Sequence, residues 1–115
     1  MGVVSDLTFI KTFTGNDPVK IKKYVGMFLQ MAIPALDQMD AQLAGSDWKS
    51  LKTTSHSLKS QMKYMGMTSG AELAQLIEGR AGEVKELDQL GNNLNELRSI
   101  VTTGVAELQA ELDQL

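Results

Sequence analysis

Apolar residues that recur every three or four positions dominate this chain and restrict it to helical folds. In one stretch they fall at Ile21, Val25, Phe28, Ala32, Leu36, Met39 and Leu43, and a last stretch keeps similar spacings from Leu87 to Leu115. Because residues three and four apart share one face of an α-helix, each stretch predicts a helix with one apolar face. No segment shows the strict alternation of a half-exposed strand.

Turn and capping residues mark where the first two helices should begin and end. Ser5 can cap a short helix whose apolar residues are Leu7, Ile10 and Phe13. The sequence TGNDP (14–18) should end it, and Asp17 followed by Pro18 predicts the start of the second helix: a capping carboxylate, then proline at the first helical position. Pro34 should kink this helix without ending it, since the apolar pattern continues past it.

Three further helices follow a turn at AGSDW (44–48), in which Asp47 is the expected N-cap of the third helix. The inward face of the third helix is expected to carry Trp48, Leu51, Ser55, Leu58, Met62 and Met65. Gly66 should cap its C-terminus, and Ser69 with Glu72 matches a capping box that would open a fourth helix through Leu73, Leu76 and Ile77. EGRAGE (78–83) should end that helix before the long last one. The sequence thus predicts an all-α fold: an antiparallel four-helix bundle with a short additional N-terminal helix, in which residues 1–115 form a single domain.

Composition excludes several classes of protein. The chain has no cysteine, so disulfides, thiolate metal sites and a cysteine nucleophile are ruled out. No apolar run approaches the ~20 residues of a membrane span, and the start MGVVSDLTF lacks the basic and apolar regions of a signal peptide. We therefore expect a monomer in the cytoplasm that does not associate with membranes.

The charge is unevenly distributed. The net charge is −3, and from Glu72 onward nine acidic residues stand against Arg80, Lys85 and Arg98. Before Glu72 the balance is positive, and no carboxylate lies between Trp48 and Thr68. Overall acidity argues against nucleic acid as a partner.

The only histidine, His56, lies in this basic segment. At ~100° per residue it points roughly 140° away from the apolar face of the third helix, so it should face solvent. Lys49, Lys52, Lys59 and Lys63 lie at offsets of −7, −4, +3 and +7 from it and should share its face. Neighbouring ammonium groups disfavour the charged imidazolium, which leaves a nitrogen lone pair available, and they would stabilise an added phosphoryl group.

The segment around His56 resembles the phosphorylation motif of histidine-containing phosphotransfer (HPt) domains, H-x-L-K-G with a further glycine ten residues after the histidine. Leu58, Lys59 and Gly66 match by spacing. Phe13, Gly15 and Asp17, Phe28 with Pro34, Asp47–Trp48 and Leu76–Glu78 resemble other parts of the family pattern in the same order. The family usually has glycine four residues after the histidine, where this chain has Ser60.

The resemblance implies a phosphorelay carrier. His56 would accept a phosphoryl group from the aspartyl phosphate of a response-regulator receiver domain or a hybrid histidine kinase, and would pass it to another receiver. Lys59 would stabilise the phosphoryl group, while the partner supplies the aspartate and Mg²⁺. No cofactor is expected in this chain, and without a glycine-rich nucleotide loop it has no autonomous kinase activity.

A docking surface for the receiver is predicted around the histidine, formed by Lys52, Ser60, Lys63 and Met31. Met27 and Met31 lie 100–140° from the apolar face of the second helix, so they should be flanking or exposed. They could instead contact the N-terminal helix. A metal site would need several ligands, and one histidine with no nearby carboxylate argues against it. The remaining alternative is a non-enzymatic helical adaptor without phosphotransfer.

Overall fold

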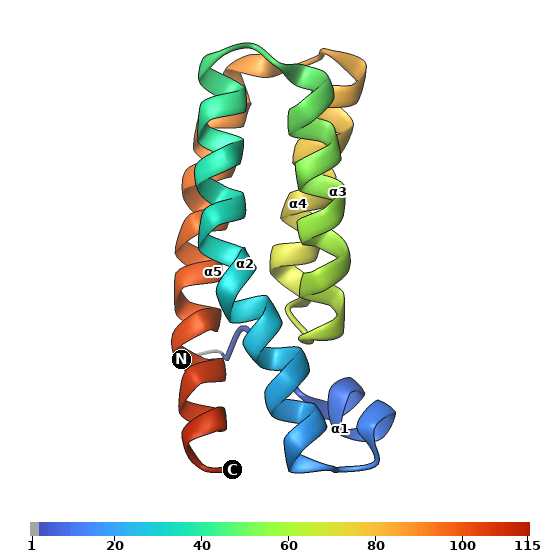
Figure 1. Ribbon diagram of the computed structural model, residues 1–115. Helices are drawn as coiled ribbons and strands as arrows, with labels where there is room; N and C mark the ends of the chain where they lie inside the picture. Colours follow the sequence, from blue (N-terminus) through green and yellow to red (C-terminus); the bar gives the residue numbers. More distant parts are fainter. Residues whose placement is uncertain (1–2) are drawn as a thin grey trace.

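The structure, a computed structural model, describes residues 3–115; Met1 and Gly2, at the start of the stretch MGVVSDLTF, lie outside the described residues. It contains α1 (Thr8–Thr14), α2 (Pro18–Ala44), α3 (Trp48–Tyr64), α4 (Thr68–Glu83), a 3₁₀ turn (Leu87–Gln89) and α5 (Leu90–Asp113). No strand occurs within residues 3–115. Figure 1 shows α2 to α5 running up and down side by side, with α1 laid against the lower part of α2. The predicted bundle with a short N-terminal helix is confirmed.

Two carboxylate caps begin the helices where the sequence places them. Asp17 accepts a hydrogen bond from the backbone N–H of Val19, with Pro18 at the first helical position. Asp47 accepts one from the N–H of Ser50 at the start of α3. Each carboxylate thus accepts a hydrogen bond from a backbone N–H that has no partner inside the helix. As predicted, α2 continues past Pro34.

Other predicted boundaries are wrong. Ser5 does not cap α1: the residue before the helix is Leu7, which makes no side-chain cap. Helix α4 starts at Thr68, without the capping box that Ser69 was expected to form. The sequence EGRAGE (78–83) does not end α4, which runs through it to Glu83. The helix ends instead at Val84, whose backbone is left-handed with φ 53° and ψ 49°. A β-branched side chain is strained in that conformation.

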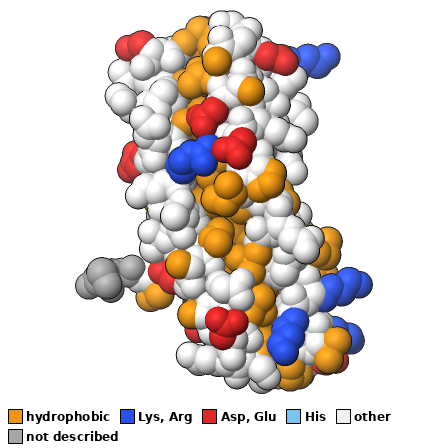
Figure 2. All heavy atoms as spheres, turned by 60° about the vertical axis from the view of Figure 1, so that its left-hand side comes forward, with side chains coloured by type: hydrophobic (Ala, Val, Ile, Leu, Met, Phe, Trp, Pro, Cys, Tyr) orange, Lys and Arg blue, Asp and Glu red, His pale blue; other side chains and the backbone are white. Residues whose placement is uncertain are grey.

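The core lies between α2, α3, α4 and α5. Its largest fully buried side chains include Phe28, Leu36, Leu58, Met62 and Leu97. On the α2–α5 side, shown in Figure 2, apolar side chains form a band along the seam between the two helices. Arg98 of α5 donates to Asp37 at 2.9 Å and to Asp40 at 2.6 Å across this seam. These contacts join the two long helices, against which α3 and α4 pack.

The segment before α1 crosses one end of the bundle and is fastened at both sides. The Glu107 carboxylate of α5 accepts hydrogen bonds from the N–H of Val4 and from the N–H and hydroxyl of Ser5. Burial raises the pKa of Glu107, but these hydrogen bonds outweigh it and leave the pKa below its usual value. The Asp6 N–H donates to the carbonyl of Met65. Gly66, at φ 67°, lies so close to Asp6 that a Cβ would overlap its carbonyl. The segment therefore positions α1 beside the end of α3.

Candidate functional site

His56 is presented to solvent on the third turn of α3. Its neighbours Leu51, Ser55, Leu58 and Met62 are fully buried and fix the rotation of the helix. The imidazole lies on the opposite side, and the His56 side chain is 61% exposed. The predicted outward direction is confirmed, so the ring is available to a large partner.

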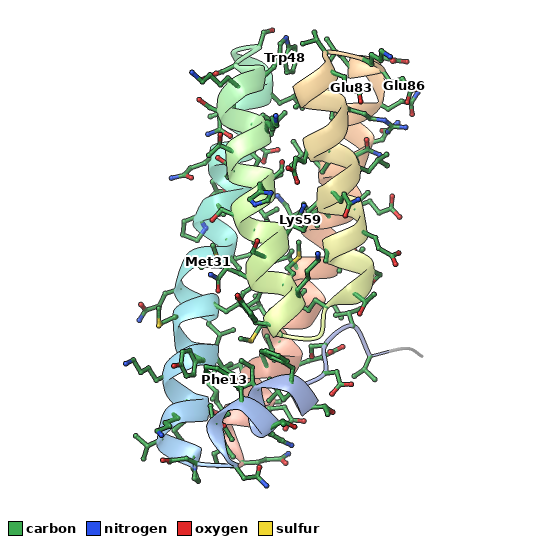
Figure 3. All side chains as sticks on the ribbon, turned by 90° about the vertical axis from the view of Figure 1, so that its right-hand side faces the viewer. Phe13, Met31, Trp48, Lys59, Glu83 and Glu86 are labelled. Carbon is green, nitrogen blue, oxygen red and sulfur yellow. The ribbon has the colours of Figure 1, made fainter. Side chains whose placement is uncertain are left out.

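Glu78 of α4 joins two predicted site residues. Its Oε2 lies 3.0 Å from His56 Nδ1, and its Oε1 accepts a hydrogen bond of 2.8 Å from Lys59 Nζ. The side chains of Lys59 and Glu78 are only 14% and 19% exposed. The pair therefore lies largely buried between α3 and α4, beside the ring. Figure 3 views this side of the molecule, with Lys59 labelled between the two helices.

Two opposing effects act on the Glu78 carboxyl. Burial raises its pKa, whereas hydrogen bonds from Lys59 and His56 lower it, and the net result is a pKa below the usual value. Glu78 is therefore ionised at neutral pH. In the tautomer that donates from Nδ1 to this carboxylate, the lone pair of His56 is on Nε2, across the ring from Glu78.

This contact corrects one part of the sequence analysis. His56 and the four lysines were expected to form a column without a carboxylate nearby, yet α4 brings Glu78 to the ring. Lys59 does not share the exposed face, because its ammonium group turns toward Glu78 of α4 and its side chain is largely buried. Lys49, Lys52 and Lys63 are exposed as expected. At this site the His56 imidazole contacts the Lys59–Glu78 ion pair, and Lys49, Lys52 and Lys63 of the same helix are exposed.

Glycine in α4 allows the two helices to approach beside the site. A Cβ at Gly82 would come within 3.1 Å of the Lys52 side chain, so the aliphatic part of Lys52 lies over this glycine. This places Lys52 one turn before His56 along α3 with its chain directed toward α4. Its predicted role in partner binding stays a prediction.

Ser60 and Met31, which were also predicted to contact the receiver, lie on different helices, α3 and α2. The Ser60 hydroxyl, one turn after His56, donates to the carbonyl of His56 at 3.2 Å. Met31 is half-buried and packs against the core; it lines a hollow between α2 and α3 with Pro34, Ala35, Gln38, Thr53, Thr54 and Ser57. Met27, by contrast, is exposed and lines a hollow with Phe9, Ile10 and Phe13 of α1.

Residues 3–115 contain neither a metal-binding cluster nor a membrane-spanning helix. No group of three histidine, cysteine, aspartate or glutamate side chains there could hold a metal ion. No helix among them has the length and apolarity needed to cross a membrane.

The fold and this site define a class: a small helical bundle with one solvent-facing histidine on a central helix. Within that class, residues 23–115 match the family model for the Hpt domain. The match covers most of the chain, which therefore belongs to the Hpt domain family.

A curated relative agrees with this assignment. The sensor protein TorS of Escherichia coli (strain K12) is 34% identical over 59 residues, which are 51% of this chain and 6% of TorS. The chain thus corresponds to a small part of that relative. No solved structure shows significant similarity to the chain.

Proposed function

We propose that this protein is a phosphorelay carrier whose phosphoacceptor is His56. The observation that supports it best is the exposed imidazole of His56, which contacts an ionised carboxylate at Nδ1 on a bundle that belongs to the Hpt family. A single partner-accessible nucleophile fits a carrier that receives and returns one group. The phosphoryl donor would be the aspartyl phosphate of a receiver domain, either a response regulator or part of a hybrid histidine kinase.

The chemistry follows from the tautomer that Glu78 favours. The Nε2 lone pair attacks phosphorus, an N–P bond forms, and the bond between phosphorus and the aspartyl oxygen breaks. The electron pair of that bond leaves with the aspartate carboxylate of the partner. No proton has to move, because Nδ1 keeps its hydrogen and the ring becomes positively charged. Glu78, 3.0 Å from Nδ1, stabilises this charge as it develops.

Lys59 has two roles in this proposal. Before transfer its ammonium group holds Glu78 beside the ring at 2.8 Å. Since it is three residues after His56 on the same helix, it is also within reach of a phosphoryl group on the imidazole. The partner would supply Mg²⁺ to neutralise the transferring group, and this chain would hold only the acceptor end of the reaction.

A non-enzymatic adaptor is the second candidate function, and the same bundle would serve it. The two candidates differ in one measurable property. An adaptor binds its partner with equal affinity whether or not residue 56 can accept phosphate, whereas a carrier is labelled there.

The test is transfer of radiolabel from phosphorylated receiver domains to the wild-type chain and to His56→Gln. Glutamine keeps a polar, exposed side chain, so the variant should fold normally, which circular dichroism verifies. We expect acid-labile label on the wild type and none on His56→Gln. Equal labelling of both proteins would overturn the assignment of the phosphoacceptor, and absence of label from the wild type would favour the adaptor.

A further inference from the structure

A second row of residues runs along α2, on the side of the helix that adjoins α5. We call it the α2 row; it comprises Lys22, Gly26, Leu29, Ile33, Asp37 and Asp40, at spacings of three and four. At ~100° per residue its members lie within about 80° of one another around the helix axis. Asp37 and Asp40 identify the side on which the row lies, because both accept hydrogen bonds from Arg98 of α5.

The middle of the α2 row is apolar and only partly covered by the rest of the chain. Leu29 and Ile33 pack against the core but are half-buried, as are Val105 and Leu112 of α5. In Figure 2, apolar and uncharged side chains on this face lie between charged groups toward its two ends. A Cβ at Gly26 would meet nothing within 4 Å, so no contact inside the chain requires glycine there, although glycine is less favourable than alanine within a helix. The row therefore offers another helix an apolar centre and, at Gly26, a point of close approach.

The outer surface of α5 beside this row has no exposed charge along its second half. Between positions 99 and 110 the exposed residues are Ser99, Thr102, Thr103, Ala106, Gln109 and Ala110. The one charged residue of that stretch, Glu107, is half-buried and accepts hydrogen bonds from Val4 and Ser5 of the N-terminal segment. Exposed surfaces of soluble proteins normally mix charges of both signs, whereas depletion of charge marks the centre of a protein–protein interface.

The two ends of the α2 row carry opposite charge. Lys22, at the start, is exposed and forms no ion pair within residues 3–115. At the far end, Asp37 and Asp40 are 67% and 52% exposed and share the single guanidinium of Arg98, which leaves a net charge of −1. Positions 22 and 40 are centred on residue 31, and so are positions 29 and 33. If two copies of the row are placed antiparallel, Lys22 therefore meets Asp40 and Leu29 meets Ile33, so the row is complementary to itself.

The same antiparallel arrangement aligns α5 with its copy. Helices α2 and α5 run in opposite directions (Figure 1), and Arg98 lies level with Asp37 and Asp40. Val105, seven residues after Arg98, is therefore level with the middle of the α2 row. A face two helices wide, ~20 Å, and as long as the 24 residues of α5, ~36 Å, covers roughly 720 Å². This is close to the area of about 800 Å² that a standard interface buries on each partner.

From these observations we infer that the face formed by α2 and α5 binds a second copy of this chain, with α2 against α2 and α5 against α5 about a two-fold axis near Val105. This dimer replaces the monomer expected from composition. In Figure 1, α3 and α4 lie on the side of the bundle away from this face. Each copy therefore keeps its His56 exposed, and the inference does not depend on whether that histidine accepts a phosphoryl group.

The first experiment compares Gly26→Gln with the matched control Gly79→Gln in sedimentation equilibrium at micromolar to millimolar concentrations. Each glycine lies inside a helix, Gly26 in α2 and Gly79 in α4, and a Cβ at either would meet nothing within 4 Å. Because glutamine is a better helix former than glycine, both variants should melt at or above the wild-type temperature. We expect Gly26→Gln to raise the dissociation constant of the dimer about tenfold or more, and Gly79→Gln to change it by less than about twofold.

The second experiment exchanges the charges at the ends of the row. Lys22→Glu places a carboxylate opposite Asp40, and Asp40→Lys places an ammonium group opposite Lys22 while Arg98 keeps its hydrogen bond to Asp37. Each variant alone should dimerise about tenfold or more weakly than the wild type, whereas an equimolar mixture should form a heterodimer in which every pair again has opposite charge. Circular dichroism verifies that both variants are folded.

Three results would contradict the inference. A wild-type chain that stays monomeric over the whole concentration range would overturn it. A dimer that Gly26→Gln leaves unchanged would place the interface on another face of the bundle and would overturn it as well. If the wild type dimerises but the mixture of Lys22→Glu and Asp40→Lys does not associate, the antiparallel pairing of Lys22 with Asp40 is wrong.

Discussion

Replacing Glu78 by glutamine should slow phosphoryl acceptance by about tenfold. The carboxylate lies 3.0 Å from His56 Nδ1, and the ring gains a positive charge when Nε2 bonds to phosphorus. Two unit charges at that distance attract by roughly 5.5 kcal/mol at an effective dielectric constant of 20 and by roughly 1.4 kcal/mol in water. Because His56 is 61% exposed, solvent screens the pair and the lower value applies. About 1.4 kcal/mol corresponds to a factor of ten in rate.

Electrostatic repulsion between Glu78 and the phosphoryl group opposes this attraction but is smaller. The same carboxylate repels the incoming phosphoryl group, but that group approaches Nε2, on the far side of the ring. Lys59, 2.8 Å from the other carboxylate oxygen, offsets part of the repulsion. Glutamine can still accept a hydrogen bond from Nδ1 and so keep the tautomer. Alanine cannot, and Glu78→Ala should be slower than Glu78→Gln.

The assay is the initial rate of labelling by phosphoramidate, which isolates the chemistry of the ring from receiver docking. Glu72→Gln is the matched control. Glu72 is an exposed glutamate of the same helix, and the hollows that it lines do not include His56. It should change the rate by less than twofold. Labelling of Glu78→Gln at or above the wild-type rate would refute the reasoning. A faster rate would mean that Glu78 restrains Lys59 rather than activating His56.

Three further outcomes are expected. Lys59→Ala should slow transfer or shorten the lifetime of phosphohistidine more than Lys49→Ala does, since Lys59 is one turn from His56 and Lys49 is two. Equal effects of the two substitutions would indicate that the lysines act only through their combined electrostatic field. Val84→Asn should raise the free energy of unfolding by about 1 kcal/mol, measured in urea, because asparagine tolerates φ 53° better than valine; an unchanged midpoint would show that the loop is unstrained. Glu107 has a lowered pKa in the folded state, so its contribution to stability is present above its unfolded value of about 4.5 and is lost as pH falls through the folded pKa. Glu107→Gln should therefore unfold more easily at pH 7 and show a weaker loss of stability in acid, and parallel pH profiles of the two proteins would contradict this.

The sequence predicts most of the fold because its signals are local and agree with one another. Asp17 and Pro18 supply a cap and a first-turn residue at the same place, and the apolar pattern that follows has a single helical period. The outward direction of His56 follows from the buried residues around it on α3. These inferences need only the geometry of one helix.

What the sequence misses depends on contacts between helices. Two glycines in EGRAGE suggested that α4 ends there, yet packing of Ile77 and Ala81 against the core keeps it helical. Because α4 was expected to end there, the contact between Glu78 and His56 was not predicted. The two residues are 22 positions apart in the sequence and meet only because α3 and α4 pack side by side. Pairing α3 with a continuous α4 as antiparallel neighbours joined by a short turn would have placed Glu78 close to His56. The sequence also leaves open which apolar residues of α1 are buried, because a helix as short as α1 buries too few residues to fix its rotation from pattern alone; in the structure Ile10 is buried and Phe13 is exposed.

The attachment of the N-terminal segment to Glu107 has a consequence for folding. Ser5 and Glu107 are 102 residues apart, whereas His56 and Glu78 lie on adjacent helices joined by a three-residue turn. Contacts between near neighbours in the chain form at low entropic cost, and those that close nearly the whole chain form last. The contact between His56 and Glu78 can therefore form within the α3–α4 hairpin before α1 is attached. During synthesis and in partial unfolding, the molecule therefore passes through states in which His56 and Glu78 are already in contact while α1 is not yet attached to the bundle.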